Sequence, residues 1–208
     1  MKVGTPMFSV EPIELVRTAG RLTELSFGRE HGRDPWLLVR LGGDDEELAA
    51  ALRAAEASAA TAAPGKIAFH TEIVSEALRL KRGGAQATEP DWQNIVKSLG
   101  DARYYAVAVR KRPGVDAAFG DRVSVGRALN KDIAFRHASI SKFHAYFQIV
   151  DSEHCRLADA GSKNGTIVNG VPLSKDGVDV VSGDHVTFGS ITTIVLDART
   201  LWRVLRAK

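Results

Sequence analysis

The spacing of apolar residues changes near the middle of the chain. Within residues 67–81, four apolar side chains stand three or four positions apart, as on one face of an α-helix: Phe69, Ile73, Ala77 and Leu80. Within residues 143–149 they occupy every second position, as on one face of a β-strand. We therefore expect an α+β protein in three parts: a mainly helical region over 1–100, an antiparallel β-sandwich over 101–197 and a short C-terminal helix over 198–208.

Start and stop signals divide the first hundred residues into helices. Ser9 can cap a helix whose leucines recur at helical spacing up to Gly28. Acidic residues at 44–47 suit the positive end of the Ala-rich helix that follows them. The next helix is expected over 67–81, and a short one ends at Gly100.

Short apolar segments separated by glycine and polar residues fill the second half of the chain. Residues 104–109 have the composition of a strand, and residues 143–149 form a half-buried one. Residues 186–188 and 191–196 fit the two strands of a closing hairpin. Many short strands at close spacing are typical of a β-sandwich. The apolar run at 36–41 fits either a strand or a helix.

The composition sets bounds on the class of protein. The chain has 208 residues, enough for one large domain or two small ones, and its 44% hydrophobic content can supply a core. No apolar run is long enough to span a bilayer, and the N-terminus lacks the apolar stretch of a signal peptide. We therefore expect a cytoplasmic protein without membrane insertion. The single cysteine, Cys155, excludes an internal disulfide and fits a reducing compartment.

The net charge of +3 leaves two interpretations open. One is a slightly basic soluble protein, because so small an excess of charge rarely marks a binding surface. The other is a protein with an anionic partner, either nucleic acid or a phosphorylated chain. Composition alone does not separate them.

Three polar clusters stand at the edges of predicted strands in the second half. They are Gly126-Arg127 with Asn130 and Asp132, the segment 139–144 and the segment 161–170. Each brings glycine, serine, asparagine or a basic residue to the end of a strand. If these loops meet at one end of a sandwich, they form an edge rich in hydrogen-bond donors.

The residue types of these clusters suit a phosphate group. Arg127 and Lys142 supply positive charge, Ser141 a hydroxyl, and Asn164 an amide that both donates and accepts. Glycine lets the backbone approach a ligand closely, and a carboxamide can grip a peptide main chain. Metal ligands are not clustered there. The set therefore favours a phosphorylated, extended peptide over a metal.

The order of the clusters resembles a known family. Gly-Arg, then Ser-x-x-His, then Asn-Gly-Thr-x-x-Asn-Gly is similar to the signature of the forkhead-associated (FHA) domain, over roughly residues 102–197. The resemblance implies a two-sheet sandwich whose loops at one end hold a phosphothreonine segment. It implies an adaptor in Ser/Thr kinase signalling, which binds a phosphothreonine-containing protein, either the kinase or its substrate, without a cofactor.

The resemblance also implies a role for each site residue. Phosphate-binding residues would be Arg127, Ser141, Lys142 and Lys163, and Asn164 would bind the backbone of the peptide. Supporting residues would be Gly126, His144, Gly165, Thr166 and Asn169. Lys142 stands where the family often carries arginine. An ammonium group there replaces the planar guanidinium, so we expect weaker binding of the phosphate. The loop near 135–138 varies freely in the family.

Other functions have less support in the sequence. An assembly protein is the main alternative, in which the sandwich and the helical region contact partners or form an oligomer without phosphorylation. No nucleophile constellation, paired carboxylates or metal spacing indicates an enzyme, and His154-Cys155 is not a ligand pair. Neither half matches a nucleic-acid-binding module. The abundance of alanine, arginine and glycine is typical of a GC-rich bacterium.

Overall fold

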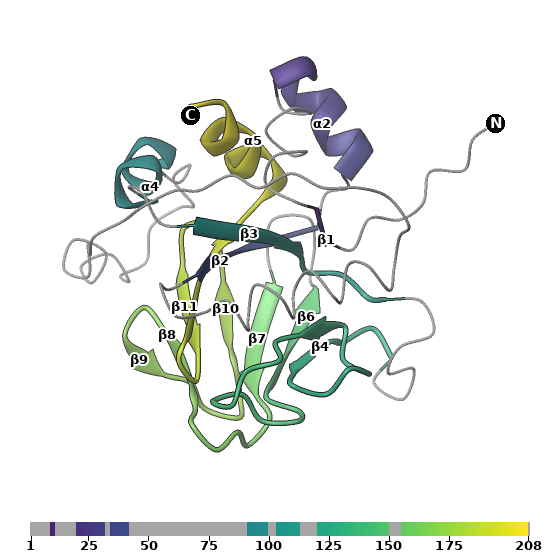
Figure 1. Ribbon diagram of the computed structural model, residues 1–208, viewed down its shortest axis with the longest axis vertical. Helices are drawn as coiled ribbons and strands as arrows, with labels where there is room; N and C mark the ends of the chain where they lie inside the picture. The colour runs from purple at the N-terminus through teal and green to yellow at the C-terminus, as the bar shows by residue number, and fades with distance from the viewer. Residues whose placement is uncertain are drawn as a thin grey trace.

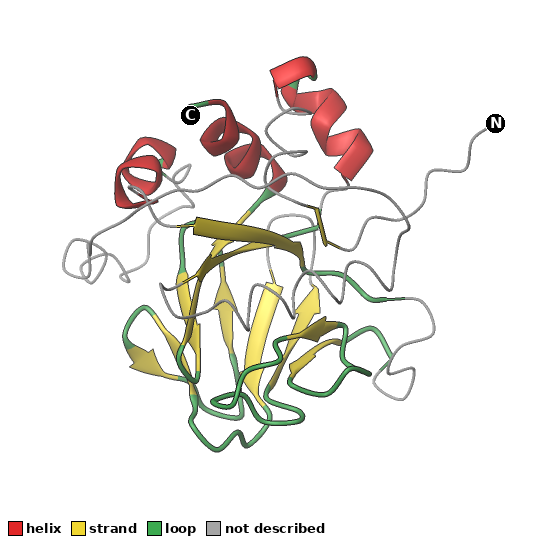
Figure 2. Ribbon diagram, viewed as in Figure 1, coloured by secondary structure: helices red, strands yellow, loops and turns green. Residues whose placement is uncertain are grey.

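The computed structural model describes residues 9–10, 20–31, 34–41, 91–99, 103–112, 120–149 and 155–207. Their strands form two sheets that pack face to face, and three helices cover the outer side of the larger sheet (Figures 1 and 2). The helices lie at one end of the molecule, and long loops lie at the other. The α+β class and the β-sandwich expected from the sequence are confirmed.

The larger sheet has seven strands and draws on both halves of the chain. Every pair of neighbouring strands in it is antiparallel. In spatial order the strands are β1 (Ser9–Val10), β3 (Arg103–Ala108), β2 (Trp36–Leu41), β12 (Ile191–Leu196), β11 (His185–Phe188), β8 (Thr166–Val168) and β9 (Val171–Pro172).

The smaller sheet has five strands, all from the second half of the chain. In spatial order they are β10 (Val178–Val180), β7 (Cys155–Asp159), β6 (Ala145–Ile149), β4 (Val123–Gly126) and β5 (Ile133–Ala134). The pairs are antiparallel except β4 with the two-residue edge strand β5, which is parallel.

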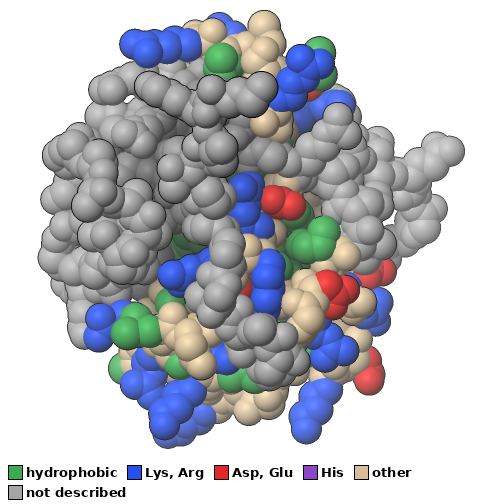
Figure 3. All heavy atoms as spheres, turned by 90° about the vertical axis from the view of Figure 1, so that its right-hand side faces the viewer, with side chains coloured by type: hydrophobic (Ala, Val, Ile, Leu, Met, Phe, Trp, Pro, Cys, Tyr) green, Lys and Arg blue, Asp and Glu red, His purple; other side chains and the backbone are tan. Residues whose placement is uncertain are grey.

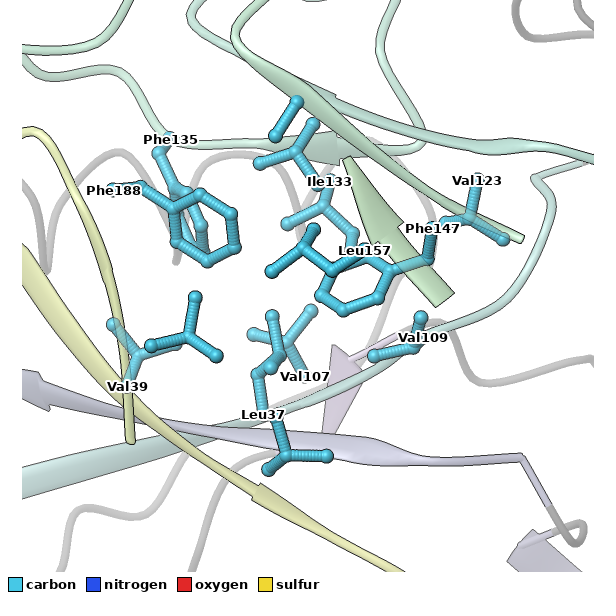
Figure 4. Packing of buried hydrophobic residues seen from close by; sticks show 14 of the residues in the cluster. Leu37, Val39, Val107, Val109, Val123, Ile133, Phe135, Phe147, Leu157 and Phe188 are labelled. Atoms are coloured by element: carbon cyan, nitrogen blue, oxygen red, sulfur yellow. The ribbon is translucent and has the colours of Figure 1, made fainter. Parts of the chain in front are cut away.

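Alternate residues of both sheets build the core between them. Leu37 and Val107 point inward from the larger sheet, and Phe147 and Leu157 meet them from the smaller one (Figure 4). Phe188 lies among them, with its ring centroid 6.2 Å from that of Phe147 in an edge-to-face arrangement. This period of two is the one that the sequence showed over residues 143–149.

A second core lies on the outer face of the larger sheet. The helices there are α2 (Glu24–His31), α4 (Trp92–Leu99) and α5 (Ala198–Arg206). Phe27 of α2 packs with Trp36 and Leu38 of β2, and Leu201 of α5 joins the same cluster. The indole N–H of Trp202 donates to the carbonyl of Leu22 over 3.1 Å, which ties α5 to the segment before α2.

The segment 36–41 is a strand, which settles the ambiguity in the sequence. It pairs with β3 on one side and with β12 on the other. Trp36 and Leu38 face the helices, whereas Leu37 and Val39 face the sandwich core. A strand buried on both faces has a continuous apolar run in place of alternation, so its sequence does not distinguish it from a buried helix.

One predicted helix start is wrong. Ser9 does not cap a helix, because Ser9–Val10 pairs with Val107 and Ala106 as a short edge strand. The helix found nearby, α2, begins at Glu24, after Thr23, whose hydroxyl accepts the backbone N–H of Ser26 over 3.3 Å. It also continues through Gly28, where we expected a helix to end.

The remaining helix predictions divide into two groups. The helix ending at Gly100 and the C-terminal helix are confirmed as α4 and α5. The helices expected after 44–47 and over 67–81 lie outside the described residues. The domain boundary at residue 101 stays a prediction. The strands β1 and β2, which precede residue 101, belong to the larger sheet. Within the described part of the chain, no helix has the length and apolar character needed to cross a membrane.

Candidate functional site

The sandwich ends in a set of neighbouring loops on the side away from the helices (Figure 1). The strands β4 and β7 end there, whereas β6, β8 and β12 begin there, so the register of the pairs brings their loops together. We call these loops the rim. It comprises residues 127–132, 139–144, 160–165 and 189–190.

Gly126 and Arg127 lie where β4 meets the loop that precedes β6. The Arg127 backbone N–H donates to the Ser141 carbonyl over 2.8 Å. A Cβ atom on Gly126 would lie 2.3 Å from the carbonyl oxygen of Lys142, so this close approach requires glycine. The Arg127 side chain is exposed, and its Nε donates to the Ile140 carbonyl over 3.1 Å. That bond uses one of the five donors of the guanidinium.

Ser141 links two loops of the rim. Its Oγ accepts the backbone N–H of Lys163 over 3.0 Å. Since the oxygen acts as acceptor in this bond, the hydroxyl hydrogen remains available as a donor. Ser141 is half-buried, whereas Lys142 and Lys163 are exposed. The arrangement brings one hydroxyl and three cationic side chains, with Arg127 the third, to neighbouring positions of the rim.

His144 connects the same two loops from below. Its Nδ1 accepts the backbone N–H of Ser141 over 3.1 Å, and its Nε2 lies 3.1 Å from the carbonyl oxygen of Gly165. An Nδ1 that accepts implies that Nε2 carries the proton and donates to Gly165. Burial lowers the pKa of His144, outweighing the Gly165 carbonyl and the charge of Asp159, which raise it. The ring is therefore neutral near pH 7.

Asn164 joins the third loop to the segment before Ser141. Its Nδ2 donates to the Ser139 carbonyl over 2.8 Å, and its side chain is exposed. Ser139 is itself tied to the turn between β11 and β12, because its Oγ lies 2.8 Å from Ser190 Oγ. Gly165 has a φ of 75°, which only glycine adopts readily, so the Asn-Gly pair forms the sharp turn before β8.

The family model of the FHA domain matches residues 123–189. These residues form an FHA domain. The match begins at the first residue of β4 and ends at the turn after β11, so it includes the three loops that carry the predicted site residues. The strands β1, β2, β3 and β12 and the described helices α2, α4 and α5 lie outside it.

Solved FHA domains resemble this one at modest identity. The FHA domain of CT664 protein from Chlamydia trachomatis is 29% identical, with 38% of this chain and 78% of that chain covered and a TM-score of 0.35. The FHA domain of an Arabidopsis thaliana hypothetical protein is 28% identical, with 48% and 75% covered and a TM-score of 0.35. The FhaA FHA domain, solved in complex with the intracellular domain of Rv3910, is 27% identical, with 36% and 78% covered and a TM-score of 0.33. No curated protein matches the chain.

Asp159 organises the rim, a role that was not predicted from the sequence. Its carboxylate accepts the backbone N–H groups of Gly161 and Ser162, each over 2.8 Å, and the hydroxyls of Ser162 and Thr166, each over 2.7 Å. Burial alone would raise the pKa of Asp159, but these hydrogen bonds outweigh it and lower the pKa. The signal in the sequence is Asp-Ala-Gly-Ser, the composition of an Asx turn.

Of the predicted site residues, Asn169 lies apart from the rim. It occupies the turn between β8 and β9, at the far end of β8, with a φ of 50°. Its Nδ2 donates to Asp184 over 2.6 Å, and its Oδ1 accepts the His185 N–H over 2.9 Å. It braces a turn and does not face the predicted ligand. The other predicted residues, Gly126, Arg127, Ser141, Lys142, His144, Lys163, Asn164, Gly165 and Thr166, lie in or directly beside the rim.

Among the described residues, no group of three or more His, Cys, Asp or Glu side chains is placed to hold a metal ion. Cys155 is buried at the start of β7, and its Sγ lies 3.9 Å from the carbonyl oxygen of Val180. The donors of the rim are hydroxyl, amide and cationic groups, which suit an anion better than a cation.

Proposed function

We propose that this FHA domain binds a phosphothreonine-containing segment of a partner protein at the rim, as a non-catalytic adaptor in Ser/Thr kinase signalling. The family match at residues 123–189 supports the proposal. The observation that carries it is the hydrogen bond from the Lys163 N–H to Ser141 Oγ. That bond fixes the serine oxygen as an acceptor and leaves its hydrogen to donate outward, beside the exposed guanidinium of Arg127.

A phosphate dianion would receive charge-assisted hydrogen bonds from this set. Arg127 is held by the Ile140 carbonyl through Nε, so the other N–H groups of its guanidinium are presented at little further entropic loss. Lys142 and Lys163 add mobile positive charge from the flanking loops. Charge-assisted bonds are about twice as strong as neutral ones, which gives selectivity for the phosphorylated partner.

Asn164 would bind the main chain of the peptide beside the phosphothreonine. Its Nδ2 has two hydrogens, and the bond to the Ser139 carbonyl uses one of them. The amide oxygen and the second hydrogen can then pair with an N–H and a carbonyl of an extended peptide. The bond to Ser139 fixes the plane of the amide before the ligand arrives.

Calorimetric titration tests this proposal. The probe is a degenerate peptide pool with a fixed central phosphothreonine, compared with the same pool unphosphorylated. We expect measurable affinity only for the phosphorylated pool, and equal affinity for both pools would refute phosphate recognition. Arg127→Ala should reduce the affinity at least about 30-fold, since a charged hydrogen-bonding partner contributes about 2 kcal/mol or more. Arg29→Gln is the control, because Arg29 is an exposed arginine on α2.

An assembly role is the second candidate, and the helical layer is the observation that favours it. The helices α2, α4 and α5 cover the larger sheet and leave the rim accessible at the opposite end (Figure 1). A second partner, or a second copy of the chain, could contact this layer while the rim is occupied. Sedimentation of the intact chain over a range of concentrations tests self-association, and a monomer at all concentrations would exclude an oligomer.

A further inference from the structure

Three side chains beside Asn164 form a hydrogen-bonded cluster that the proposed function does not use. They are His137, Ser139 and Ser190, and we call them the serine cluster. Ser139 Oγ lies 2.8 Å from His137 Nδ1 and 2.8 Å from Ser190 Oγ. Ser139 and Ser190 are 51 positions apart in the sequence, so the cluster joins the loop before β6 to the turn between β11 and β12.

The backbone bonds of the serine cluster fix the direction of its side-chain bonds. The Ser139 N–H donates to His137 Nδ1 over 3.2 Å, so that nitrogen is an acceptor. The Ser139 hydroxyl then donates to Nδ1, and its oxygen accepts the Ser190 N–H over 3.1 Å. The contact between the two hydroxyls leaves Ser190 as the donor to Ser139 Oγ. Both the backbone N–H and the hydroxyl of Ser139 are thereby bonded within the cluster.

The carbonyl of Ser139 is the group that orients Asn164. It accepts a hydrogen bond from Asn164 Nδ2 over 2.8 Å, and within the described part of the chain this is the only hydrogen bond of that carboxamide. A Cβ atom on Gly189 would lie 2.6 Å from the Ser139 carbonyl oxygen and 2.9 Å from Ser139 Oγ, so the turn at 189–190 packs directly against Ser139. The serine cluster therefore holds the acceptor that fixes the plane of the Asn164 amide.

The phosphate-binding side of the rim is anchored by other groups. His144 Nδ1 accepts the Ser141 N–H, and the Lys163 N–H donates to Ser141 Oγ. Lys and Arg side chains project from the lower end of the molecule in Figure 3, the end at which the rim lies in Figure 1. The serine cluster makes none of these hydrogen bonds, and its two hydroxyls carry no charge. The rim thus has two separate supports, one beneath the phosphate-binding groups and one beside Asn164.

We infer that Ser139 and Ser190 are positioning residues for main-chain recognition, because they hold the Asn164 carboxamide in the plane in which it pairs with the peptide backbone. This inference rests on the proposed function, in which Asn164 binds the main chain beside the phosphothreonine. An amide that is fixed before binding loses less rotational freedom when the ligand arrives, so the peptide binds more tightly. The serine cluster acts through Asn164, and its loss should weaken peptide binding without weakening phosphate binding.

A double-mutant cycle between Ser190 and Asn164 tests the inference. The ligand is the degenerate peptide pool with a fixed phosphothreonine, and Ser190→Ala should reduce its affinity about five-fold, the contribution of one ordinary hydrogen bond. Asn164→Ala should reduce the affinity further. The double variant should bind no more weakly than Asn164→Ala alone, because the serine cluster has nothing left to position once the carboxamide is removed.

Competition by inorganic phosphate provides a second measurement. Phosphate has no main chain, so the concentration at which it displaces the labelled peptide pool reports only on the charged side of the rim. We expect the inhibition constant of phosphate to be the same for the unsubstituted chain and for Ser190→Ala. The matched control Ser98→Ala removes a hydroxyl of α4 that donates to the Ile95 carbonyl over 2.7 Å, and it should change neither the peptide affinity nor the inhibition constant.

Three outcomes would overturn the inference and leave phosphothreonine recognition standing. They are an unchanged peptide affinity in either single variant, losses that multiply in the double variant, and a fall in phosphate affinity equal to the fall in peptide affinity. The last outcome would mean that Ser190→Ala disturbs the whole rim. If the unsubstituted chain did not prefer the phosphorylated pool, the proposed function and the inference would fall together.

Discussion

At the scale of single residues, the rim depends on the small size of Gly126 and on the neutral form of His144. Gly126 has the carbonyl of Lys142 where a side chain would begin. His144 must accept at Nδ1 and donate at Nε2, so only its neutral form satisfies both neighbours. Both residues position the loops of the rim, so these requirements hold whether or not a ligand is bound.

Gly126→Ala tests the first constraint. The added methyl group would lie 2.3 Å from the Lys142 carbonyl oxygen, and backbone atoms would have to move apart. We expect the free energy of unfolding to fall by about 1–3 kcal/mol in urea titrations. In the matched control, Gly28→Ala on α2, no atom outside the adjacent residues and the backbone of the same helix lies within 4 Å of the new methyl group. That change should stabilise the protein by up to about 1 kcal/mol, since alanine favours a helix.

The histidines predict a loss of stability in mild acid. Burial lowers the pKa of His144 and also that of His185, where it outweighs the charge of Asp184. As the pH falls below about 6.5, the unfolded chain takes up protons on these rings before the folded chain does, so folding becomes less favourable. Urea midpoints measured between pH 7.5 and 5 should decrease, and His144→Gln should reduce this dependence. An unchanged pH dependence in the variant would contradict the assignment.

At the scale of elements, strand β2 of the larger sheet is buried on both faces, and Phe27 is the side chain of α2 that enters the second core. Phe27 has no exposed surface, whereas Leu25 on the same helix is 75% exposed. Phe27→Ala should lower the free energy of unfolding by about 3–5 kcal/mol, because it leaves a cavity in the second core. Leu25→Ala should change it by less than about 0.5 kcal/mol. Equal effects in chemical denaturation would show that α2 does not pack as described.

The rim was easier to predict from the sequence than the sheet that supports it. Gly126, Ser141 and Asn164 belong to short motifs, and the spacing of the residues in each motif can be read from a single sequence. The strand at 36–41 has no such motif. Its apolar run reflects burial between the helices and the smaller sheet, and these partners are not visible in the local sequence. Ser190 was not predicted for a similar reason, because its bond to Ser139 joins residues distant in sequence.

At the scale of the whole molecule, the β-sandwich extends beyond residues 123–189, which match the FHA family model. The strand β2, from the first part of the chain, lies between β3 and β12. A fragment of residues 101–208 would lose that strand and expose apolar surface in both cores. We expect such a fragment to show poorly dispersed amide resonances and to bind a hydrophobic dye, in contrast to the intact chain. Well-dispersed resonances would show that β3 and β12 pair directly in its absence.

The position of β2 also has a consequence for biosynthesis. Trp36 pairs with Leu196, so β2 gains this neighbour only after a segment much later in the sequence has been synthesised. Pairing between segments so distant in sequence closes a large loop, which slows folding. During translation the apolar strand β2 therefore lacks this partner, and the nascent chain is prone to aggregation until β12 has been synthesised.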